Sequence, residues 1–509
     1  MYLTQSLHRA VQQSPEAIAT ICGERVRTFA SSADRIARLA GGLRQLGVQQ
    51  GDRVGILALN SDRYHEYLYA VPWLGAVLNP VNIRWSATEI IYSLRDSDTT
   101  VLLVDDTHAA MIAPIRAGFP ELRTIIYIGD GQPPPNTVSY EQLLATADPI
   151  ADSRTGGSEL LGIFYTGGTT GTPKGVMLSH QNLLTSALGA LASGQYISTR
   201  GRLLHVAPMF HLAGIAAWTA GNLVGSAHIF QPRFVPSEAL HAIQAYRITD
   251  IILVPTMIQM LIDEPDVDTY QLDTLRCLAY GASVISEAVL ERARTVFPSA
   301  AFTQAYGMTE LAPVATILLP EDHDDTVLRR AAGRAAPHTE VRIVNDDGTE
   351  VPRGSVGEVA VRGNNVMLGY WNRPEDTAAA VRDGWMHTGD GGYMDDAGYV
   401  FIVDRIKDMI ITGGENVYSA EVENAIAQHQ AVASVAVIGV PDERWGESVH
   451  AVVVLRAGRH ADEGELRDHC RNLIAGYKVP STIAFTDVLP MSAAGKILKR
   501  QLREQLTTA

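Results

Sequence analysis

Two hydrophobic periods alternate along the first part of the chain. Residues 28–47 carry apolar side chains at helical spacing, and Gly47 is placed to end that helix. Short apolar runs at 54–59 and 101–106 flank a helical pattern near 62–75, which is typical of a strand–helix–strand unit. Because strands and helices that alternate form a parallel sheet covered by helices, this part predicts an α/β fold.

The same alternation resumes in the middle of the chain. A helix is expected around 181–193, and strands at 251–255, 275–281 and 302–307 each end in Pro or Gly. Ligands of open α/β sheets bind outside the carboxyl ends of the strands. Loops that follow such ends come after Tyr165, Val254, Tyr280 and Ala305.

From about residue 333 the pattern changes to antiparallel pairs. Residues 340–363 alternate around an Asp347-Gly348 turn, and 391–405 form a second strand pair. We therefore expect an N-terminal domain over residues 1–406, with helix-covered sheets and a β-rich subdomain.

A small α+β unit follows the β-rich part, and we expect it to be a mobile C-terminal domain over residues 407–509. It has a helix from Glu421, strands at 432–440 and 450–458, and a helix ending at Gly476.

Composition narrows the class of protein. The chain has 509 residues, 46% of them hydrophobic and 19% charged, which is ordinary for a folded protein with roughly two to four units. Its net charge of −15 argues against a nucleic-acid partner, because binding a phosphodiester backbone requires a basic face.

Cysteine content and apolar runs bear on disulfide bonds and on the cellular location of the protein. Three widely separated cysteines predict neither a disulfide framework nor a zinc site. The N-terminal residues lack the apolar core of a signal peptide, and no run of about 18 apolar residues would span a membrane. We expect a cytoplasmic protein; its oligomeric state stays open, a homodimer included.

Candidate chemistry starts at residues 160–175, read as LLGIFYTGGTTGTPKG. A β-favouring run gives way to glycine and threonine, closed by Pro173, Lys174 and Gly175. Glycine lets several backbone N–H groups point at one anion, and Lys174 adds a cation. No Gly-Lys-Ser/Thr follows, so this is not a Walker A loop. We call residues 166–174 the phosphate cradle; the alternative is a plain Gly/Thr linker.

Further motifs then identify a family by resemblance. They are YTGGTTGTPKG (165–175), PMFHLAG (208–214), YGMTE (306–310), GEVAVRGNNVMLGYWN (357–372), HTGD (387–390), DRIKDMIITGGENVYSAEVE (404–423) and GKILKR (495–500). In this order, over nearly the whole chain, they resemble the acyl-CoA synthetases of the adenylate-forming superfamily. That superfamily includes fatty-acyl-CoA and 4-coumarate-CoA ligases, amino-acid-activating domains and firefly luciferase.

The resemblance implies a two-step reaction with ATP, Mg²⁺ and coenzyme A. A carboxylate attacks the α-phosphorus of ATP to give acyl-AMP and pyrophosphate, and the thiol of CoA then displaces AMP. Both steps gather negative charge, which fixed dipoles and cations stabilise. One departure lies in the cradle, where Gly167 replaces the family's usual serine and a hydroxyl for the β- or γ-phosphate is lost.

The resemblance also assigns residues to the ATP or AMP site. Glu310 resembles the magnesium ligand, with Thr166 close by, and would otherwise be a solvated loop acid. Tyr306 resembles the residue on the adenine face, or else is a core tyrosine. Asp390 and Arg405 resemble the partners of the ribose hydroxyls, with an ion pair between them as the alternative. The remaining members of this set are Gly167, Gly168, Thr169, Thr170, Gly171, Lys174, Gly281, Ala282, Gly307 and Thr309.

The resemblance also assigns a catalytic lysine, a hinge and CoA contacts to the C-terminal domain. Lys496 resembles the catalytic lysine that contacts the substrate carboxylate and the α-phosphate, and would otherwise be a surface lysine. Lys407 falls at the family's hinge position. Gly413 and Gly414 would let pantetheine pass, or form a tight turn. Aromatic positions that resemble CoA contacts are Trp445 and Tyr477.

The acyl pocket is expected to be apolar. His211 lies where the family places a residue at the pocket mouth, and an imidazole there disfavours an amino acid substrate; the alternative is a core histidine. Other expected lining residues are Ile215, Met257, Ala282, Val284 and Val314. Few polar groups occur in these stretches, so an apolar acid is implied.

The predicted function is an ATP-dependent acid–CoA ligase acting on a medium-to-long fatty acid or an arylpropenoic acid. The alternatives are an acyl-AMP ligase that loads a carrier protein, a luciferase-like oxygenase and a non-enzymatic nucleotide sensor.

Overall fold

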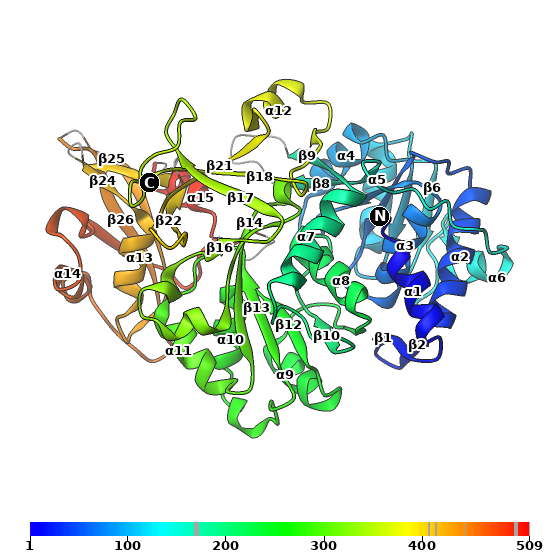
Figure 1. Cartoon of the computed structure of the whole chain (residues 1–509), viewed down its shortest axis with the longest axis horizontal. Helices are drawn as coiled ribbons and strands as arrows, with labels where there is room; N and C mark the ends of the chain where they lie inside the picture. The colour runs from blue at the N-terminus through cyan, green and yellow to red at the C-terminus, as the bar shows by residue number, and fades with distance from the viewer. Residues whose placement is uncertain (167–172, 406–407, 413–414, 443, 493–496, 508–509) are drawn as a thin grey trace.

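The computed structural model describes residues 1–166, 173–405, 408–412, 415–442, 444–492 and 497–507. These residues form four β-sheets, which we call sheets A to D, with helices packed against them (Figure 1). Sheets A and B belong to the large N-terminal part, sheet C to the β-rich subdomain and sheet D to the small C-terminal domain. The expected α/β class with a smaller C-terminal unit is confirmed.

Sheet A contains three of the four strand ends that the sequence singled out, and the fourth, at Tyr165, belongs to sheet B. In spatial order its strands are β16 (Arg334–Ala335), β15 (Val314–Leu318), β14 (Ala301–Gly307), β13 (Cys277–Gly281), β12 (Asp250–Leu253), β10 (Arg202–His205), β11 (Ala227–Phe230), β1 (Ile18–Cys22) and β2 (Arg25–Thr28). The strands from β14 to β1 run parallel to their neighbours, as the alternating pattern predicts. The carboxyl ends of these strands therefore meet at one edge of the sheet.

Sheet B carries the phosphate cradle. Its order is β19 (Gly369–Tyr370), β9 (Lys174–Ser179), β8 (Leu160–Thr166), β4 (Val77–Pro80), β3 (Arg53–Leu57), β5 (Val101–Val104), β6 (Thr124–Tyr127) and β7 (Val138–Ser139). Strands β8 and β9 are antiparallel and pair up to Thr166 and Lys174, the two ends of the cradle. Strand β19 pairs with β9 on the other side.

Sheets C and D complete the chain. Sheet C contains β17 (Thr339–Val344), β18 (Gly357–Gly363), β21 (Trp385–Met394), β20 (Val381–Arg382) and β22 (Val400–Arg405), all antiparallel. Sheet D contains β24 (Glu415–Val417), β23 (Ile410–Thr412), β26 (Gly446–Leu455), β25 (Val432–Asp442) and β27 (Thr482–Phe485).

The helices begin where side chains can cap them. Thr28, Ser61, Ser86 and Ser179 each accept a hydrogen bond from a backbone N–H in the first turn, which satisfies a donor that the helix leaves free. The helices are α1 (Gln5–Gln13), α2 (Phe29–Gln45), α3 (Asp62–Trp73), α4 (Ala87–Asp96), α5 (Ile112–Gly118), α6 (Tyr140–Thr146), α7 (His180–Ala192), α8 (Leu212–Val224), α9 (Pro236–Ala245), α10 (Pro255–Ile262), α11 (Glu287–Val296), α12 (Pro374–Ala380), α13 (Ser419–Ala427), α14 (Glu463–Arg471) and α15 (Lys499–Thr507).

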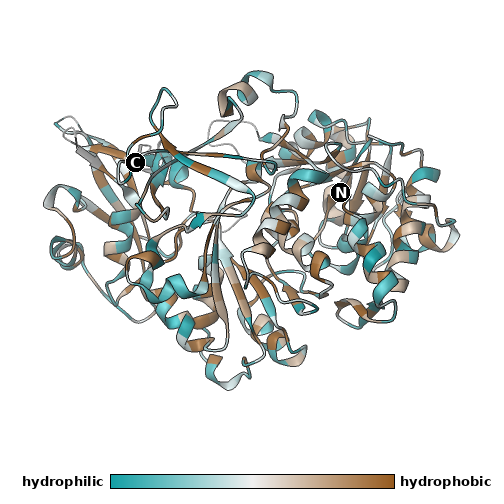
Figure 2. Ribbon diagram, viewed as in Figure 1, coloured by the Kyte–Doolittle hydropathy of each residue, from teal (hydrophilic) through white to brown (hydrophobic). Residues whose placement is uncertain are grey.

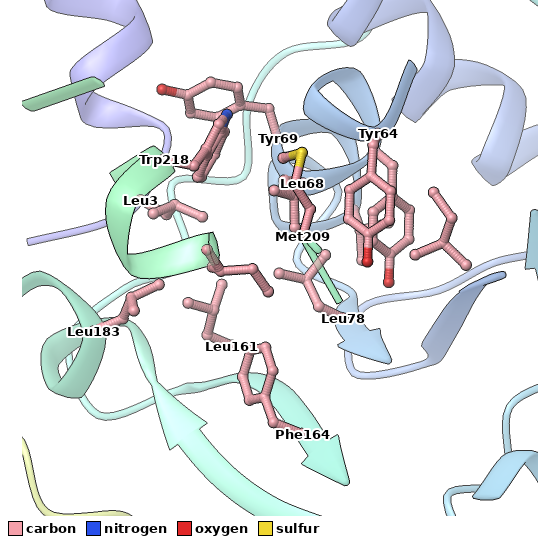
Figure 3. Close-up of a cluster of buried hydrophobic side chains, with 14 of the residues drawn as sticks. Leu3, Tyr64, Leu68, Tyr69, Leu78, Leu161, Phe164, Leu183, Met209 and Trp218 are labelled. Carbon is pink, nitrogen blue, oxygen red and sulfur yellow. The ribbon is translucent and has the colours of Figure 1, made fainter. Parts of the chain in front are cut away.

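Apolar residues gather on the strands and on the inward helix faces (Figure 2). One buried cluster joins Leu161 and Phe164 of β8 to Leu183 of α7 and Trp218 of α8, with Met209 between the strands and helices (Figure 3). This cluster fixes the base of the cradle hairpin against the helix that begins after His211. Within the described part of the chain, none of the helices combines the length and apolarity that a membrane span requires.

Two details correct or complete the sequence predictions. Helix α14 ends at Arg471 rather than at Gly476, and a separate 3₁₀ turn, η7 (Gly476–Lys478), follows it. Cys22, Cys277 and Cys470 are buried free thiols.

Candidate active site

The two ends of the phosphate cradle lie side by side. Thr166 is the last residue of β8, Lys174 is the first of β9, and the two are paired in the antiparallel register. The Thr166 hydroxyl donates to the Lys174 carbonyl at 3.5 Å. The other predicted cradle positions, Gly167, Gly168, Thr169, Thr170 and Gly171, lie outside the described residues.

The Lys174 ammonium is held by two groups. Its Nζ donates to Oδ1 of Asp376 at 2.7 Å, in the first turn of α12, and it lies 5.1 Å from the centre of the Tyr370 ring. Both the ion pair and the cation–π contact keep the charge at the cradle. An incoming anion would therefore compete with Asp376 for this lysine.

Tyr370 connects the cradle to Glu310. The Tyr370 hydroxyl donates to Oε1 of Glu310 at 2.7 Å, and Glu310 is only 6% exposed in the short helix η3 (Thr309–Leu311). Burial raises the pKa of Tyr370 far above its ordinary value, and the Glu310 carboxylate adds to the shift, so the phenol stays protonated as a donor. Strand pairing of Tyr370 with Val176 fixes this arrangement.

The donor set suits magnesium only in part. Among the described residues no group of three or more His, Cys, Asp or Glu side chains could hold a metal ion. Glu310 offers one buried carboxylate, and η3, which carries it, packs against β9. Mg²⁺ typically takes one or two carboxylates and fills its other positions with water and phosphate oxygens. Glu310 therefore fits a magnesium ion that arrives together with a phosphate ligand.

Tyr306, Asp390 and Arg405 form one connected group. The Tyr306 hydroxyl donates to Oδ2 of Asp390 at 2.6 Å, and Nε of Arg405 lies 2.6 Å from Oδ1 of the same carboxylate. Asp390 is 6% exposed. Burial raises the pKa of Tyr306 well above its usual value, with the Asp390 charge as the second cause. The alternative ion pair of Asp390 with Arg405 is thus present, and a role of either residue toward a ribose stays a prediction.

A carboxylate that the sequence did not single out holds the HTGD segment. Glu358 of β18 accepts from Nδ1 of His387 at 2.7 Å and from the backbone N–H of Gly389 at 2.9 Å. These bonds fix the turn that presents Asp390. The only sign of Glu358 in the sequence is its place in the motif at 357–372, and Tyr370 lies in the same motif.

Close backbone contact explains the glycines at the edge of sheet A. A Cβ on Gly281 would lie 2.1 Å from the carbonyl oxygen of Ala305 on the neighbouring strand. A Cβ on Gly307 would lie 1.8 Å from the carbonyl oxygen of Pro313. Ala282 follows with a positive φ of 70°. The strands can approach at this edge only without those side chains, so the AMP-site positions predicted here are sterically constrained.

His211 lies at the N-terminus of α8, and its ring centroid is 4.1 Å from that of Phe210. The segment before it is fixed by Asn60, which is buried. Asn60 donates to the carbonyl of Ala207 at 3.0 Å and accepts from the N–H of Met209 at 2.8 Å. Asn60 was not predicted, because nothing local in its sequence indicates a partner so far along the chain.

The predicted acyl-pocket residues lie in different surroundings. Ile215 and Val314 are buried in separate hydrophobic clusters, and Met257 packs at the margin of a third. Ala282 is exposed, and Val284 is 61% exposed. Their common role as a pocket stays a prediction.

The predicted CoA contacts lie on the surface of the C-terminal domain. Trp445 is 48% exposed with the Arg444 guanidinium 4.6 Å from its ring, and Tyr477 is 47% exposed. The predicted catalytic lysine, hinge and channel glycines, Lys496, Lys407, Gly413 and Gly414, lie outside the described residues.

Comparison with known proteins adds independent findings. A family model described as AMP-binding enzyme matches residues 7–371, and one described as AMP-binding enzyme C-terminal domain matches residues 421–496. A feruloyl-CoA synthase of Amycolatopsis sp is 39% identical over 498 residues, which cover 98% of this chain and 97% of that protein.

Two further relatives broaden the comparison. A fatty acid–acyl-carrier-protein ligase of Streptomyces coeruleorubidus is 37% identical over 99% of this chain and 95% of that protein. Among solved structures, an anthranilate CoA ligase in complex with anthranoyl-AMP superposes with a TM-score of 0.94 at 26% identity, over 100% of this chain and 98% of that one.

Proposed function

Because the chain belongs to the AMP-binding enzyme family, in which it is an acyl-CoA synthetase, we propose that its acid substrate is aromatic, an arylpropenoic acid in particular. The enzyme converts a carboxylic acid to acyl-AMP and then to the CoA thioester. The observation that carries the proposed substrate class is the 39% identity with a feruloyl-CoA synthase along almost the whole of both chains. The mostly apolar stretches that follow His211 suit such an acid.

In the first step the cradle would bind the β- and γ-phosphates of ATP. Lys174 would exchange the Asp376 carboxylate for a phosphate oxygen, since both are anions of similar reach. Gly167 leaves only backbone donors where relatives have a hydroxyl, so the loop's contact with pyrophosphate would be weaker. The ion pair of Lys174 with Asp376 would then form again as the product pyrophosphate leaves.

Glu310 would be the protein ligand of a magnesium ion, with the Thr166 hydroxyl near it. Bound Mg²⁺ would neutralise phosphate charge as the carboxylate attacks. The hydrogen bond from Tyr370 leaves Oε2 of Glu310 for that role while fixing the direction of the carboxylate. Tyr370 is thereby a positioning residue.

Asp390 and Arg405 would hold the ribose of ATP. A carboxylate accepts at two oxygens with about four lone-pair sites, and Tyr306 and Arg405 use two of them. The remaining sites would accept the ribose hydroxyls without breaking the ion pair. The Tyr306 ring would lie against the adenine.

In the second step the C-terminal domain would turn about Lys407. Gly413 and Gly414 would line the path of pantetheine, and Trp445 and Tyr477 would contact the CoA nucleotide. Lys496 would serve adenylation only, because it contacts the carboxylate and the α-phosphate in that step. His211 would close the acyl end of the site in both steps.

A carrier-protein ligase is the second candidate, because a relative with that name is 37% identical over almost the whole chain. Exposed Trp445 and Tyr477 would suit a CoA nucleotide or a carrier surface equally. The oligomeric state, a homodimer included, stays a prediction.

A substrate panel tests the proposal. Purified enzyme with ATP, Mg²⁺ and CoA would be given ferulate, 4-coumarate, cinnamate, octanoate and palmitate, and AMP and thioester would be measured. We expect kcat/KM to be highest for an arylpropenoic acid. A higher value for octanoate or palmitate would refute the substrate class, and AMP without thioester unless a carrier protein is added would favour the second candidate.

A further inference from the structure

A cavity of about 250 Å³ lies at the edge of sheet A away from the candidate active site. Arg202 and Ala227, the first residues of β10 and β11, line it. Gly281 and Gly307 lie at the carboxyl ends of the same sheet. Helix α8 joins the two regions, with His211 before its start and Gly225 of the cavity after its end. Its thirteen residues span about 20 Å, so the cavity is a separate site.

Three arginines and no acidic side chain line this cavity. Arg9, from α1, which contacts α8, lies with Arg200 and Arg202 around it, in a chain whose net charge is −15. None of the three forms an ion pair with any described residue. Like charges that line one cavity without a carboxylate repel one another, and an anion would relieve that repulsion.

Capping of helix ends accounts for part of this arrangement. Arg9 donates from Nη2 to the carbonyl of Leu223 near the end of α8, and Arg202 donates from Nη1 to the carbonyl of Tyr246 at 2.8 Å after α9. Each of these contacts uses one of the five donors of a guanidinium. Arg200 is exposed and has no side-chain hydrogen bond to a described residue. Donors on all three arginines therefore remain for a ligand.

The buried carboxylate beside Gly201 does not neutralise these charges. Asp250 lies behind Gly201, is 1% exposed and does not line the cavity. Its Oδ1 accepts from the N–H of Ser198 at 2.7 Å, and its Oδ2 accepts from the Thr249 hydroxyl at 2.5 Å. It is thus held by its own neighbours.

The rest of the lining is largely apolar. Phe29 and Ala10, which are buried, and Ile18, which is half-buried, also line the cavity. An apolar cavity of about 150 Å³ holds a benzene molecule, so about 250 Å³ leaves room for one ring and a phosphate. Three cations favour a dianion over a monoanion. We propose that this cavity is a second ligand site that binds a small organic phosphate carrying a single ring.

Calorimetric titration with phenyl phosphate tests this. We expect one molecule bound per chain, affinity that falls as NaCl is raised, weaker binding of inorganic phosphate and no binding of benzyl alcohol. The Lys174→Met variant, which weakens the cradle, should bind phenyl phosphate like the wild type. Loss of binding in Lys174→Met would place the ligand in the cradle, and equal affinity for inorganic phosphate or benzyl alcohol would contradict the proposed chemistry.

A matched pair of variants locates the site. Arg200 and Arg247 are both exposed arginines with φ near +54° and +53°, a conformation that asparagine tolerates, but only Arg200 lines the cavity. Arg200→Asn should raise the Kd for phenyl phosphate at least about tenfold, and Arg247→Asn should leave it unchanged. Melting temperatures equal to wild type would show that both fold. The same Kd in both variants would overturn the proposal.

Discussion

Arg84, in the loop after β4, donates a hydrogen bond from Nη1 to the backbone carbonyl of Ser492 at 2.9 Å, across 408 positions of sequence. Ser492 stands four residues before the predicted catalytic Lys496. A second contact between the two domains is the ion pair of Arg456 with Asp263 at 3.6 Å. Arg84 therefore ties the segment that leads to Lys496 to the large domain.

This contact predicts a selective effect of Arg84→Ala. We expect adenylation to slow about three- to tenfold, since one charged hydrogen bond to the docked segment is lost. Thioester formation from supplied acyl-AMP should be nearly unchanged, because the proposed role of Lys496 lies in the first step. Each half-reaction would be measured separately. Arg123→Ala, another exposed arginine, is the control, and equal slowing of both steps by Arg84→Ala would refute the interpretation.

Asp376→Asn should improve ATP binding. In the proposed function Asp376 competes with phosphate for Lys174, and a half-exposed ion pair of this kind contributes about 0.2–1 kcal/mol. The KM for ATP should therefore fall by up to about fivefold, and Lys174→Met should raise it. Glu375→Gln on the same helix, at an exposed position, should change nothing. A raised KM in Asp376→Asn would mean that Asp376 supports ATP binding rather than opposing it.

Tyr306→Phe should weaken the nucleotide site and the fold together. Loss of the hydroxyl removes one of the donors to the buried Asp390 carboxylate, at a cost of about 1–3 kcal/mol. We expect a lower melting temperature and a KM for ATP raised about tenfold. Tyr393→Phe, on strand β21 that carries Asp390, keeps its ring stacked on Phe401 and should behave like the wild type. Unchanged KM and melting temperature in Tyr306→Phe would exclude this role.

The buried histidines predict a loss of stability in mild acid. His65, His205 and His228 pack against one another in the core, and His205 Nε2 lies 2.8 Å from His228 Nδ1. Burial lowers the pKa of His65 to about 3 and holds those of His205 and His228 well below the ordinary value.

The direction in which stability changes with pH follows from the protons that the unfolded and folded states bind. Below about pH 6.5 the unfolded chain protonates these histidines while the folded protein does not. The free energy of unfolding should therefore fall by up to about 1.4 kcal/mol per pH unit per histidine as the pH drops. Urea unfolding at pH 7.5 and 5.5 would measure this. Between these two pH values the free energy of unfolding should fall less in His228→Gln than in the wild type. In His241→Gln, where the histidine is exposed, it should fall as much as in the wild type. An equal fall in the two variants would contradict this explanation.

The sequence predicted the elements well where a local pattern determines them. The parallel strands β12, β13 and β14 and the helix α2 follow from periodicity and caps. Helix α14 ends at Arg471, earlier than expected, and Ala475, with a ψ of 145°, separates it from the 3₁₀ turn that begins at Gly476.

Only those residues of the candidate site that lie in recognisable motifs could be predicted from the sequence. Thr166, Lys174, Glu310 and Asp390 were named from residue type and order. Asp376 and Tyr370, which contact Lys174 and Glu310, were not predicted, nor was Glu358, which holds the segment before Asp390. Each of these contacts joins positions 29 to 202 apart in the chain. The first pair joins sheet B to helix α12, the second joins sheet B to η3, and the third joins two strands of sheet C. No local pattern encodes such pairings.

The Tyr306–Asp390–Arg405 group also bears on how the protein is made. Tyr306 comes from sheet A, whereas Asp390 and Arg405 come from β21 and β22 of sheet C. A nascent chain can complete sheet A long before it reaches residue 405, yet it lacks the proposed ribose partners until the last strand of sheet C has left the ribosome. Affinity for ATP would thus arise late in synthesis. It would indicate that the large domain has been synthesised and folded completely.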